Sequence, residues 1–215
     1  MIVTRVEAVT KTKYKVYVDG QFAFILYKGE LSRFHIAEDQ ELSQESYEKI
    51  RTEVILKRAK LRAMHLLNDM WRTEAQLREK LTRNEYPADI VEAAISYVKS
   101  FGYINDYEYA RSFIESRKER KSRREIYMQL VGKGVPRELI DEAFEESYER
   151  EDSTEAIRRL LEKKHYDREN TTPEEKKKIM AYLVRKGFGY DDIRRTMQIY
   201  ECEMYSRYKE NIFKL

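Results

Sequence analysis

The sequence predicts a mainly α-helical protein, with three tandem three-helix repeats that form an elongated, curved array behind a small N-terminal antiparallel β-hairpin or sheet. Three observations predict this class. Only 7 glycines and 3 prolines occur in 215 residues, fewer than a turn-rich sandwich or barrel would need. An Asp-Gly pair separates two alternating runs near the N-terminus. One apolar pattern then recurs three times along the rest of the chain.

The N-terminal β extension is expected over residues 1–42. Apolar residues alternate with lysines and Tyr17 over 13–18, and Phe22, Phe24 and Leu26 alternate with Ala23 and Ile25 over 22–26. Asp19-Gly20 lies between the two runs. Such a pair favours a type I′ hairpin turn, because this turn needs positive φ at both central residues. Valines upstream suggest a further strand, so a sheet of two or three strands is expected. A sheet this small is not stable alone and should pack on the helical part.

The repeats follow, with predicted bounds of 43–104, 105–151 and 152–215. Each contains an anchor leucine, with apolar residues four positions before it and five and ten positions after it. The three anchors are Leu81, Leu130 and Leu183. A three-helix unit of about fifty residues buries little surface alone, so stacked neighbours are expected to supply much of the core.

Start and stop signals mark the predicted helices. Capping boxes precede the three middle helices, at Thr73…Gln76, Ser122…Glu125 and Thr172…Glu175. Asp152…Glu155 has a similar spacing, so Asp152 is expected to cap the first helix of the third repeat. A Lys-Gly pair ends the middle helix in the second and third repeats, whereas the first repeat has Asn84-Glu85 at this place.

Charge is segregated along the chain although the net charge is only +3. Six of the eight residues in 117–124 are basic, and eight residues of 138–152 are acidic. Two interpretations stay open. The runs form a basic and an acidic functional surface, or they are ordinary solvated faces of a charge-rich helical protein, with the acidic stretch folded back on the basic one.

Three segments carry a resemblance to a known family. Thr-Glu-Ala-Gln-Leu-Arg-Glu-Lys-Leu at 73–81 resembles the first conserved stretch of the RecX family. Gly-Tyr-Ile-Asn-Asp-Tyr-Glu-Tyr-Ala at 102–110 is similar to that family's most recognisable motif, and 122–135 resembles the next one. The order and spacing match, and the repeats with a β extension resemble the longer, Gram-positive type. Asn105 departs from the pattern, because an acid is commoner there, and so does Asn84-Glu85.

The resemblance implies a regulator, usually a negative one, of the RecA recombinase in DNA repair and the SOS response. RecX proteins lie in the groove of the RecA filament on DNA and interfere with filament growth, ATP hydrolysis, strand exchange and co-protease activity. Some also bind DNA. The implied partner is therefore the RecA filament, with single- or double-stranded DNA as a further candidate.

The residues themselves give poor support for an enzyme. The chain has no Gly-x-x-x-x-Gly-Lys-Ser/Thr loop, and His35, His65 and His165 are far apart in sequence. Cys202 is the one cysteine and is interpreted as a small hydrophobic residue. No catalytic residue, metal or cofactor is expected. The mean hydropathy of −0.80 and the lack of a long apolar run exclude a transmembrane span, so a cytoplasmic protein with no membrane partner is expected. A monomer is also expected.

Basic side chains are the candidate contacts with a partner or DNA, because guanidinium forks suit both phosphates and carboxylates. They form two clusters: Lys57, Arg58, Lys60, Arg62 and Arg72, then Arg117, Lys118, Arg120, Lys121, Arg123 and Arg124. Aromatic and small residues of the family-like motif are instead expected in the core, namely Tyr103, Tyr109, Ala110 and Phe113. The alternative function is a general DNA-binding helical-repeat protein without a filament partner.

Overall fold

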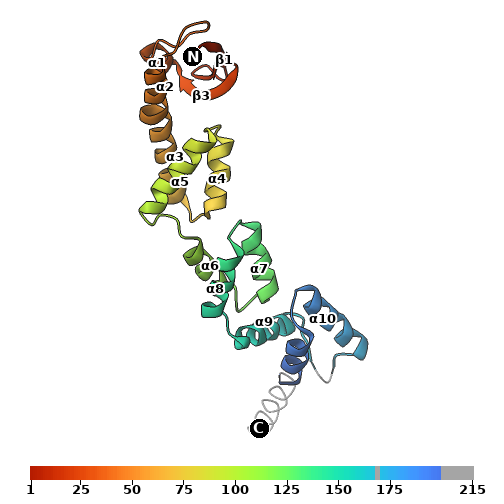
Figure 1. Ribbon diagram of the computed structural model, residues 1–215. Coiled ribbons are helices and arrows are strands. Elements are labelled where there is room, and N and C mark those ends of the chain that lie inside the picture. The colour runs from red at the N-terminus through yellow and green to blue at the C-terminus, as the bar shows by residue number, and fades with distance from the viewer. Residues whose placement is uncertain (168–169, 200–215) are drawn as a thin grey trace. The chain divides into compact units, whose positions relative to one another are not determined.

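The computed structural model describes residues 1–167 and 170–199 and contains two compact units (Figure 1). The first unit, residues 1–105, holds the sheet and the first repeat, and the second begins at residue 106 and holds the other two repeats. The predicted class, mainly helical repeats behind a small antiparallel sheet, is confirmed. Within the described residues, no helix is long and apolar enough to cross a membrane.

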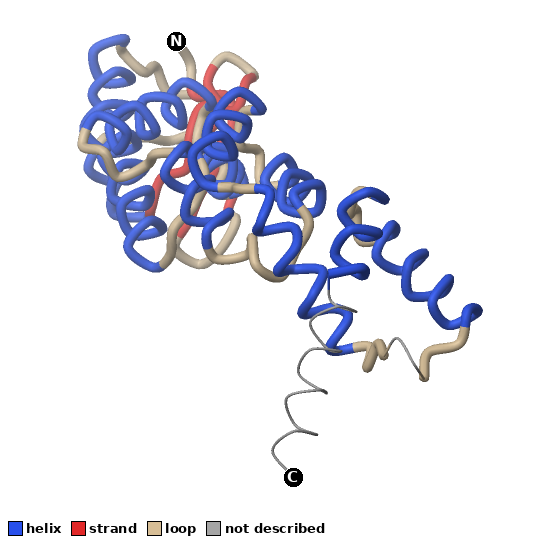
Figure 2. The backbone as a smooth tube through the Cα atoms, turned by 90° about the horizontal axis from the view of Figure 1, so that it is seen from below, coloured by secondary structure: helices blue, strands red, loops and turns tan. Residues whose placement is uncertain are grey.

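The sheet has three antiparallel strands in the order β1-β2-β3, drawn red in Figure 2. They are β1 (Val3–Ala8), β2 (Lys13–Val18) and β3 (Gln21–Tyr27). Asp19 has φ 48° and Gly20 has φ 78°, which confirms the predicted turn between β2 and β3. Val16 and Phe24 pair across these strands, and both side chains are fully buried.

A helical run follows the sheet and continues into the first repeat. Its elements are α1 (Lys28–Arg33), α2 (Gln44–Lys49), the π-helical η1 (Ile50–Leu56) and α3 (Lys57–Asp69). Because α1 is helical, the segment expected to be a β extension is not β throughout. Ser43 caps α2, since its Oγ accepts a 3.2 Å hydrogen bond from the Ser46 backbone N–H.

One apolar core joins the sheet to the first repeat. Phe24 and Leu26 of β3 lie in the same buried cluster as Ile50 of η1 and Leu81 of the first repeat. The expectation that the sheet packs on the helical part is therefore confirmed.

Each repeat consists of three helices. The first contains α3, α4 (Glu74–Arg83) and α5 (Ala88–Ser100), and the second contains α6 (Asp106–Glu115), α7 (Arg123–Gly132) and α8 (Arg137–Ser147). The third contains α9 (Arg150–Lys163), α10 (Pro173–Arg185) and a further helical stretch over 190–199. The predicted anchors Leu81, Leu130 and Leu183 are all fully buried.

The helix caps agree with the sequence at two of the middle helices and differ in detail elsewhere. Complete capping boxes start α4 at Thr73 and α10 at Thr172. Ser122 caps α7, but no reciprocal bond from Glu125 accompanies it. The expectation that Asp152 caps α9 is wrong, because this helix begins earlier: Glu149 is its N-cap, and the Glu149 backbone N–H donates to Asp152 Oδ2 at 2.8 Å.

The second and third repeats have separate apolar cores, so the expectation of a largely shared core is wrong here. Each set of three helices encloses its own anchor leucine. A polar contact joins the two repeats instead. The hydroxyl of Ser122, which is buried, donates to the Lys186 carbonyl at 2.7 Å and accepts from the Glu125 N–H at 3.1 Å. One side chain thus caps α7 and binds the end of α10.

The family-like motif is only partly a core segment. Ala110 and Phe113 are buried as expected, and Tyr109 packs against the same cluster. Tyr103 is 56% exposed, so its core assignment is wrong. It lies in the turn after α5 and stacks on Phe101, which is itself exposed. Cys202 lies outside the described residues.

Candidate functional site

Arg58 of the first basic cluster is fixed inside the first unit. Its guanidinium donates to the Ile25 carbonyl at 3.0 Å and to the Glu30 carboxylate at 2.5 Å. It also lies 4.6 Å from the ring centroid of Tyr27. The Arg58 side chain is 23% exposed. Arg58 therefore ties α3 to β3 and α1 and has little capacity left for a partner.

The other members of the first cluster have different surroundings. Lys60 lies 4.3 Å from the ring centroid of Tyr97, and Arg72 Nε donates to the Leu66 carbonyl at 3.0 Å. Lys57 is exposed. These contacts assign structural roles to Lys60 and Arg72, whereas Lys57 stays available at the surface.

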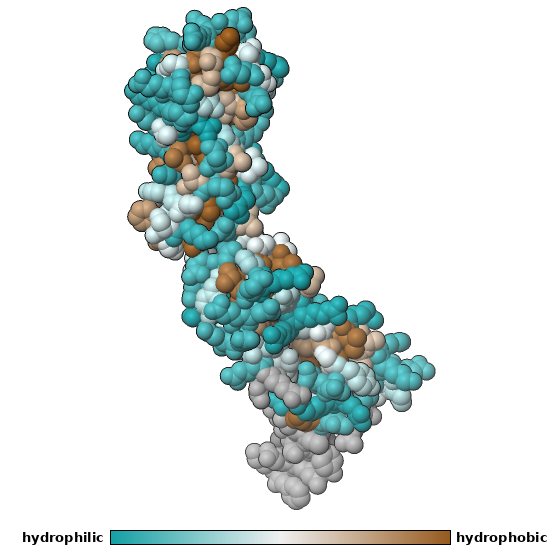
Figure 3. Space-filling model, viewed as in Figure 1, coloured by the Kyte–Doolittle hydropathy of each residue, from teal (hydrophilic) through white to brown (hydrophobic). Residues whose placement is uncertain are grey.

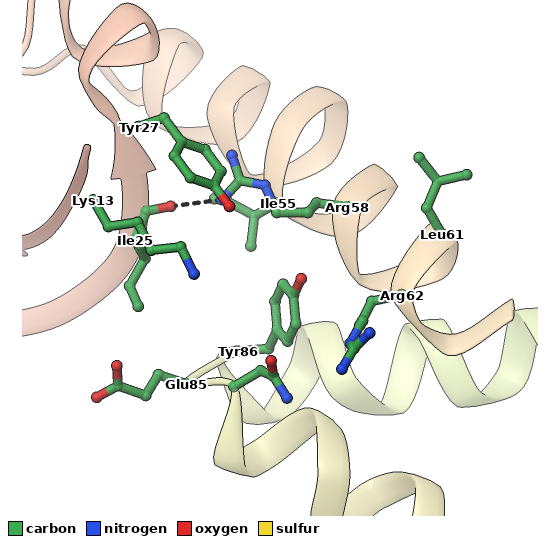
Figure 4. A pocket seen from close by; sticks show the side chains of 10 residues that line it. Lys13, Ile25, Tyr27, Ile55, Arg58, Leu61, Arg62, Glu85 and Tyr86 are labelled. Carbon is green, nitrogen blue, oxygen red and sulfur yellow. Dashed lines mark hydrogen bonds between the residues drawn. The ribbon is translucent and has the colours of Figure 1, made fainter. Parts of the chain in front are cut away.

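Arg62 and Arg58 line a cavity of about 430 Å³ in the first unit (Figure 4). Its walls come from β2 and β3, from η1 and α3, and from the loop between α4 and α5. Figure 4 shows the ring of Tyr86 between the charged ends of Lys13 and Arg62. Burial raises the pKa of the Tyr86 phenol, so its hydroxyl remains a hydrogen-bond donor at neutral pH.

Two arginines of the second basic cluster lie against aromatic rings. The guanidinium of Arg117 is 3.7 Å from the ring centroid of Phe113 and donates to the Phe113 carbonyl at 3.4 Å. Arg123 lies 4.9 Å from the ring centroid of Phe144. Both contacts fix the cation on its own repeat.

Two lysines of this cluster form ion pairs. Lys118 Nζ lies 3.1 Å from Glu115 and 3.7 Å from Asp152, and Lys121 Nζ lies 2.7 Å from Glu125. The contact with Asp152 means that the acidic stretch does fold back on part of the basic segment. These nearby carboxylates raise the pKa of Lys118, although burial opposes them.

Arg124 lies in a groove between α7 and α10, whereas Arg120 is exposed outside it. The groove has a volume of about 480 Å³ and brings Arg124 together with Arg185 and Lys186 of the third repeat. Two apolar side chains also line it, Met128 at 61% exposure and Val184 at 47%. Glu125 also lines the groove, but its carboxylate is paired with Lys121. The groove is therefore basic with an apolar part, and is suited to anionic groups.

Most side chains of these two sites were not among the candidate contacts from the sequence, including several with hydrogen-bond donors. Arg185 and Lys186 belong to the groove, and Lys13 and Tyr86 belong to the cavity. A signal existed for Lys186, because the Lys-Gly stop recurs in two repeats and places a cation at each helix end. No comparable signal placed Lys13, which comes from a strand far away in sequence.

Outside these sites, the surface is mixed. On the face drawn in Figure 3, apolar side chains form small separate areas surrounded by hydrophilic ones. In the part of the chain that the structure describes, no group of three or more His, Cys, Asp or Glu side chains could hold a metal ion.

Comparisons with known proteins identify each repeat. Three models of the RecX family match, the first three-helix domain over 59–97, the second over 105–143 and the third over 151–197. A protein named "Regulatory protein RecX" from Caldanaerobacter subterraneus subsp. tengcongensis is 32% identical over 201 residues, covering 93% of this chain and 100% of that relative. Another of the same name, from Clostridioides difficile, is 28% identical over 91% of this chain and 94% of its own length.

Solved structures agree with these relatives. A structure titled "Crystal structure of regulatory protein RecX" matches with a TM-score of 0.64 and 25% identity, covering 92% of this chain and 98% of the other. The crystal structure of RecX from Lactobacillus salivarius matches in fold with a TM-score of 0.56, over 66% of this chain.

Proposed function

The chain belongs to the RecX family, and from this premise we propose that it is a non-enzymatic, mostly negative regulator of the RecA recombinase. It acts in the cytoplasm by binding in the groove of the RecA–DNA filament, where it modulates ATP hydrolysis, strand exchange and co-protease activity. The observation that carries the proposal is the match of all three family domains, in order, in a chain that aligns with a whole regulatory relative.

The groove between α7 and α10 is the part of the surface best suited to contact the filament. A filament on DNA offers phosphates and protein carboxylates, and Arg124, Arg185 and Lys186 can pair with either. Met128 and Val184 add exposed apolar area beside these charges. Among the cations of the second cluster, Arg124 has the strongest case, because Arg117, Lys118, Lys121 and Arg123 already have partners within the unit.

Co-sedimentation with RecA filaments on single-stranded DNA tests this contact. The triple variant Arg124→Ala, Arg185→Ala, Lys186→Ala should bind filaments at least about tenfold more weakly, or about 1.4 kcal/mol. A matched control removes three exposed lysines that do not line the groove: Lys163→Ala, Lys177→Ala, Lys178→Ala. The control should retain most of the affinity. An equal loss in both triples would refute the groove, since only net charge would then matter.

Salt separates the filament regulator from a general DNA-binding repeat protein. Binding through phosphates alone falls steeply between about 50 and 200 mM salt, in proportion to the phosphates contacted. A groove that also offers apolar contacts should hold the filament at salt that abolishes binding to free DNA. Parallel loss of filament and free-DNA binding would favour the general DNA-binding function.

A further inference from the structure

The cavity in the first unit has a polar side and an apolar side. Lys13, Arg62 and the Tyr86 hydroxyl provide hydrogen-bond donors. Ile25 and Ile55 add apolar surface to the lining. Its volume of about 430 Å³ lies in the usual range for small-ligand sites, which combine apolar walls with a few polar groups.

The charges around the cavity are unevenly neutralised. Arg58 pairs with Glu30, and Glu85 pairs with Lys15 of β2. Among the described residues, neither Lys13 nor Arg62 forms an ion pair with a carboxylate, and Lys13 Nζ lies 5.7 Å from the ring centroid of Tyr27. The cavity therefore has an excess of positive charge at two side chains from separate elements, which suits a ligand with a phosphate group.

The repeat pattern provides a second, independent observation. In the second and third repeats, the loop after the middle helix reads Lys-Gly-Val at 133–135 and Lys-Gly-Phe at 186–188. In the first repeat the equivalent residues are Asn84, Glu85 and Tyr86. All three line the cavity. Tyr86 keeps the apolar character of its equivalents, whereas Asn84 and Glu85 replace the Lys-Gly pair, so this loop differs from the other two at two of the three positions that line the cavity.

The departure at Glu85 strains the backbone. Glu85 has φ 59°, in the left-handed region that Gly134 and Gly187 occupy in the other repeats. A residue with a side chain is held there at a cost of about 1–2 kcal/mol. Its ion pair with Lys15 attaches the loop to the sheet and offsets part of this cost. This attachment fixes the loop whose next residue, Tyr86, lines the cavity together with Lys13.

We propose that this cavity binds a nucleotide, with Lys13 and Arg62 on the phosphate and the ring of Tyr86 against the base. An aromatic face next to cations is the arrangement that binds a nucleotide without reading its sequence. The nucleotide is either free or one unit of a single strand. The proposal does not depend on RecA, and its test therefore uses no RecA. A negative result would refute the nucleotide site without bearing on the proposed function.

Fluorescence anisotropy with a labelled oligothymidylate about ten nucleotides long tests the cavity directly. The variant Lys13→Gln with Arg62→Gln should bind about tenfold more weakly, or about 1.4 kcal/mol. Tyr86→Leu, which removes the aromatic face, should also weaken binding, by about five- to a hundredfold. Lys11→Gln with Lys49→Gln makes the same change in charge at exposed lysines of the same unit that do not line the cavity, and should bind as the wild type does.

Competition by thymidine monophosphate identifies the source of the ligand. Displacement of the oligonucleotide means that a free nucleotide enters the site. If the monophosphate does not displace it, while the cavity variants still weaken binding of the oligonucleotide, the site is assigned to a single strand. Inorganic pyrophosphate should compete poorly. Competition by pyrophosphate as strong as that by the monophosphate would overturn the proposal, because the base would then contribute nothing. Equal binding by the cavity variants and the lysine control would overturn it as well.

A loop exchange guards against variants that fail to fold. Asn84→Lys, Glu85→Gly and Tyr86→Val together give the first repeat the loop of the second. Because the second repeat folds with this sequence, the circular dichroism spectrum should be retained while nucleotide binding is lost. A folded exchange variant that binds the oligonucleotide as tightly as the wild type would refute the proposal.

Discussion

Gly187→Ala should destabilise the joint between the second and third repeats. Gly187 has φ 91°, and a Cβ at this residue would lie 2.9 Å from Ser122 Oγ and 3.2 Å from Arg124 Cβ. Positive φ costs a residue with a side chain about 1–2 kcal/mol, and overpacking of this kind costs a further 1–3 kcal/mol, roughly. The expected loss in the free energy of unfolding is therefore about 2–5 kcal/mol.

Gly102→Ala is the matched control for backbone strain alone. Gly102 has φ 71°, and nothing lies within 4 Å of the position that a Cβ would take there. This variant should lose only about 1–2 kcal/mol. The difference between the two variants measures the close approach at the joint.

Urea unfolding can assign each effect to its unit. Trp71 is the one tryptophan and lies in the first unit, so its fluorescence reports that unit, whereas circular dichroism reports both. Gly187→Ala should leave the fluorescence midpoint unchanged and shift the dichroism transition. Gly102→Ala should shift the fluorescence midpoint.

A double-mutant cycle isolates the contact with the hydroxyl. Ser122→Ala alone should cost about 1 kcal/mol, because it removes the cap of α7 and the bond to the Lys186 carbonyl. In that background Gly187→Ala should cost about 1 kcal/mol less than in the wild type, since the nearest atom is gone. Strict additivity of the two changes would refute this account of the joint.

Two further predictions concern the cores and the response to acid. Leu130→Ala and Leu183→Ala should each lower the free energy of unfolding in urea by about 2–5 kcal/mol, because both side chains are fully buried. Losses below about 1 kcal/mol at both residues would show that they are not core anchors. The hydrogen bond from Lys99 lowers the pKa of Glu74 from its ordinary value of 4.5. The pair therefore stabilises the first unit at a pH above 4.5, and this stabilisation is lost as the pH falls through the folded-state pKa of Glu74. Glu74→Gln should therefore be less stable than the wild type at neutral pH and approach it in acid, and a constant difference at every pH would contradict the assignment.

Local signals in the sequence were sufficient for the elements that depend on them. The Asp19-Gly20 pair placed the hairpin turn, because few other residues accept positive φ twice in succession. The recurring leucines placed the buried anchors, because apolar spacing reports directly on the inward face of a helix. Ser122 was recognised as a cap on the same local basis.

Features that depend on contacts between residues far apart in sequence could not be predicted from local patterns. Arg58 was a candidate for partner binding, but its partner Glu30 is far away in sequence, and no local pattern pairs them. The groove joins Arg124 to Arg185, from different repeats. The π-helical η1 was also missed, since apolar spacing over seven residues does not separate it from an α-helix.

The rate of ATP hydrolysis by RecA on single-stranded DNA, measured as this protein is added, tests the central claim most directly. The proposed function predicts a progressive fall in that rate, with a smaller fall for the variant that lacks Arg124, Arg185 and Lys186 than for the matched lysine control. An unchanged rate at concentrations where the protein is bound to the filament would contradict it.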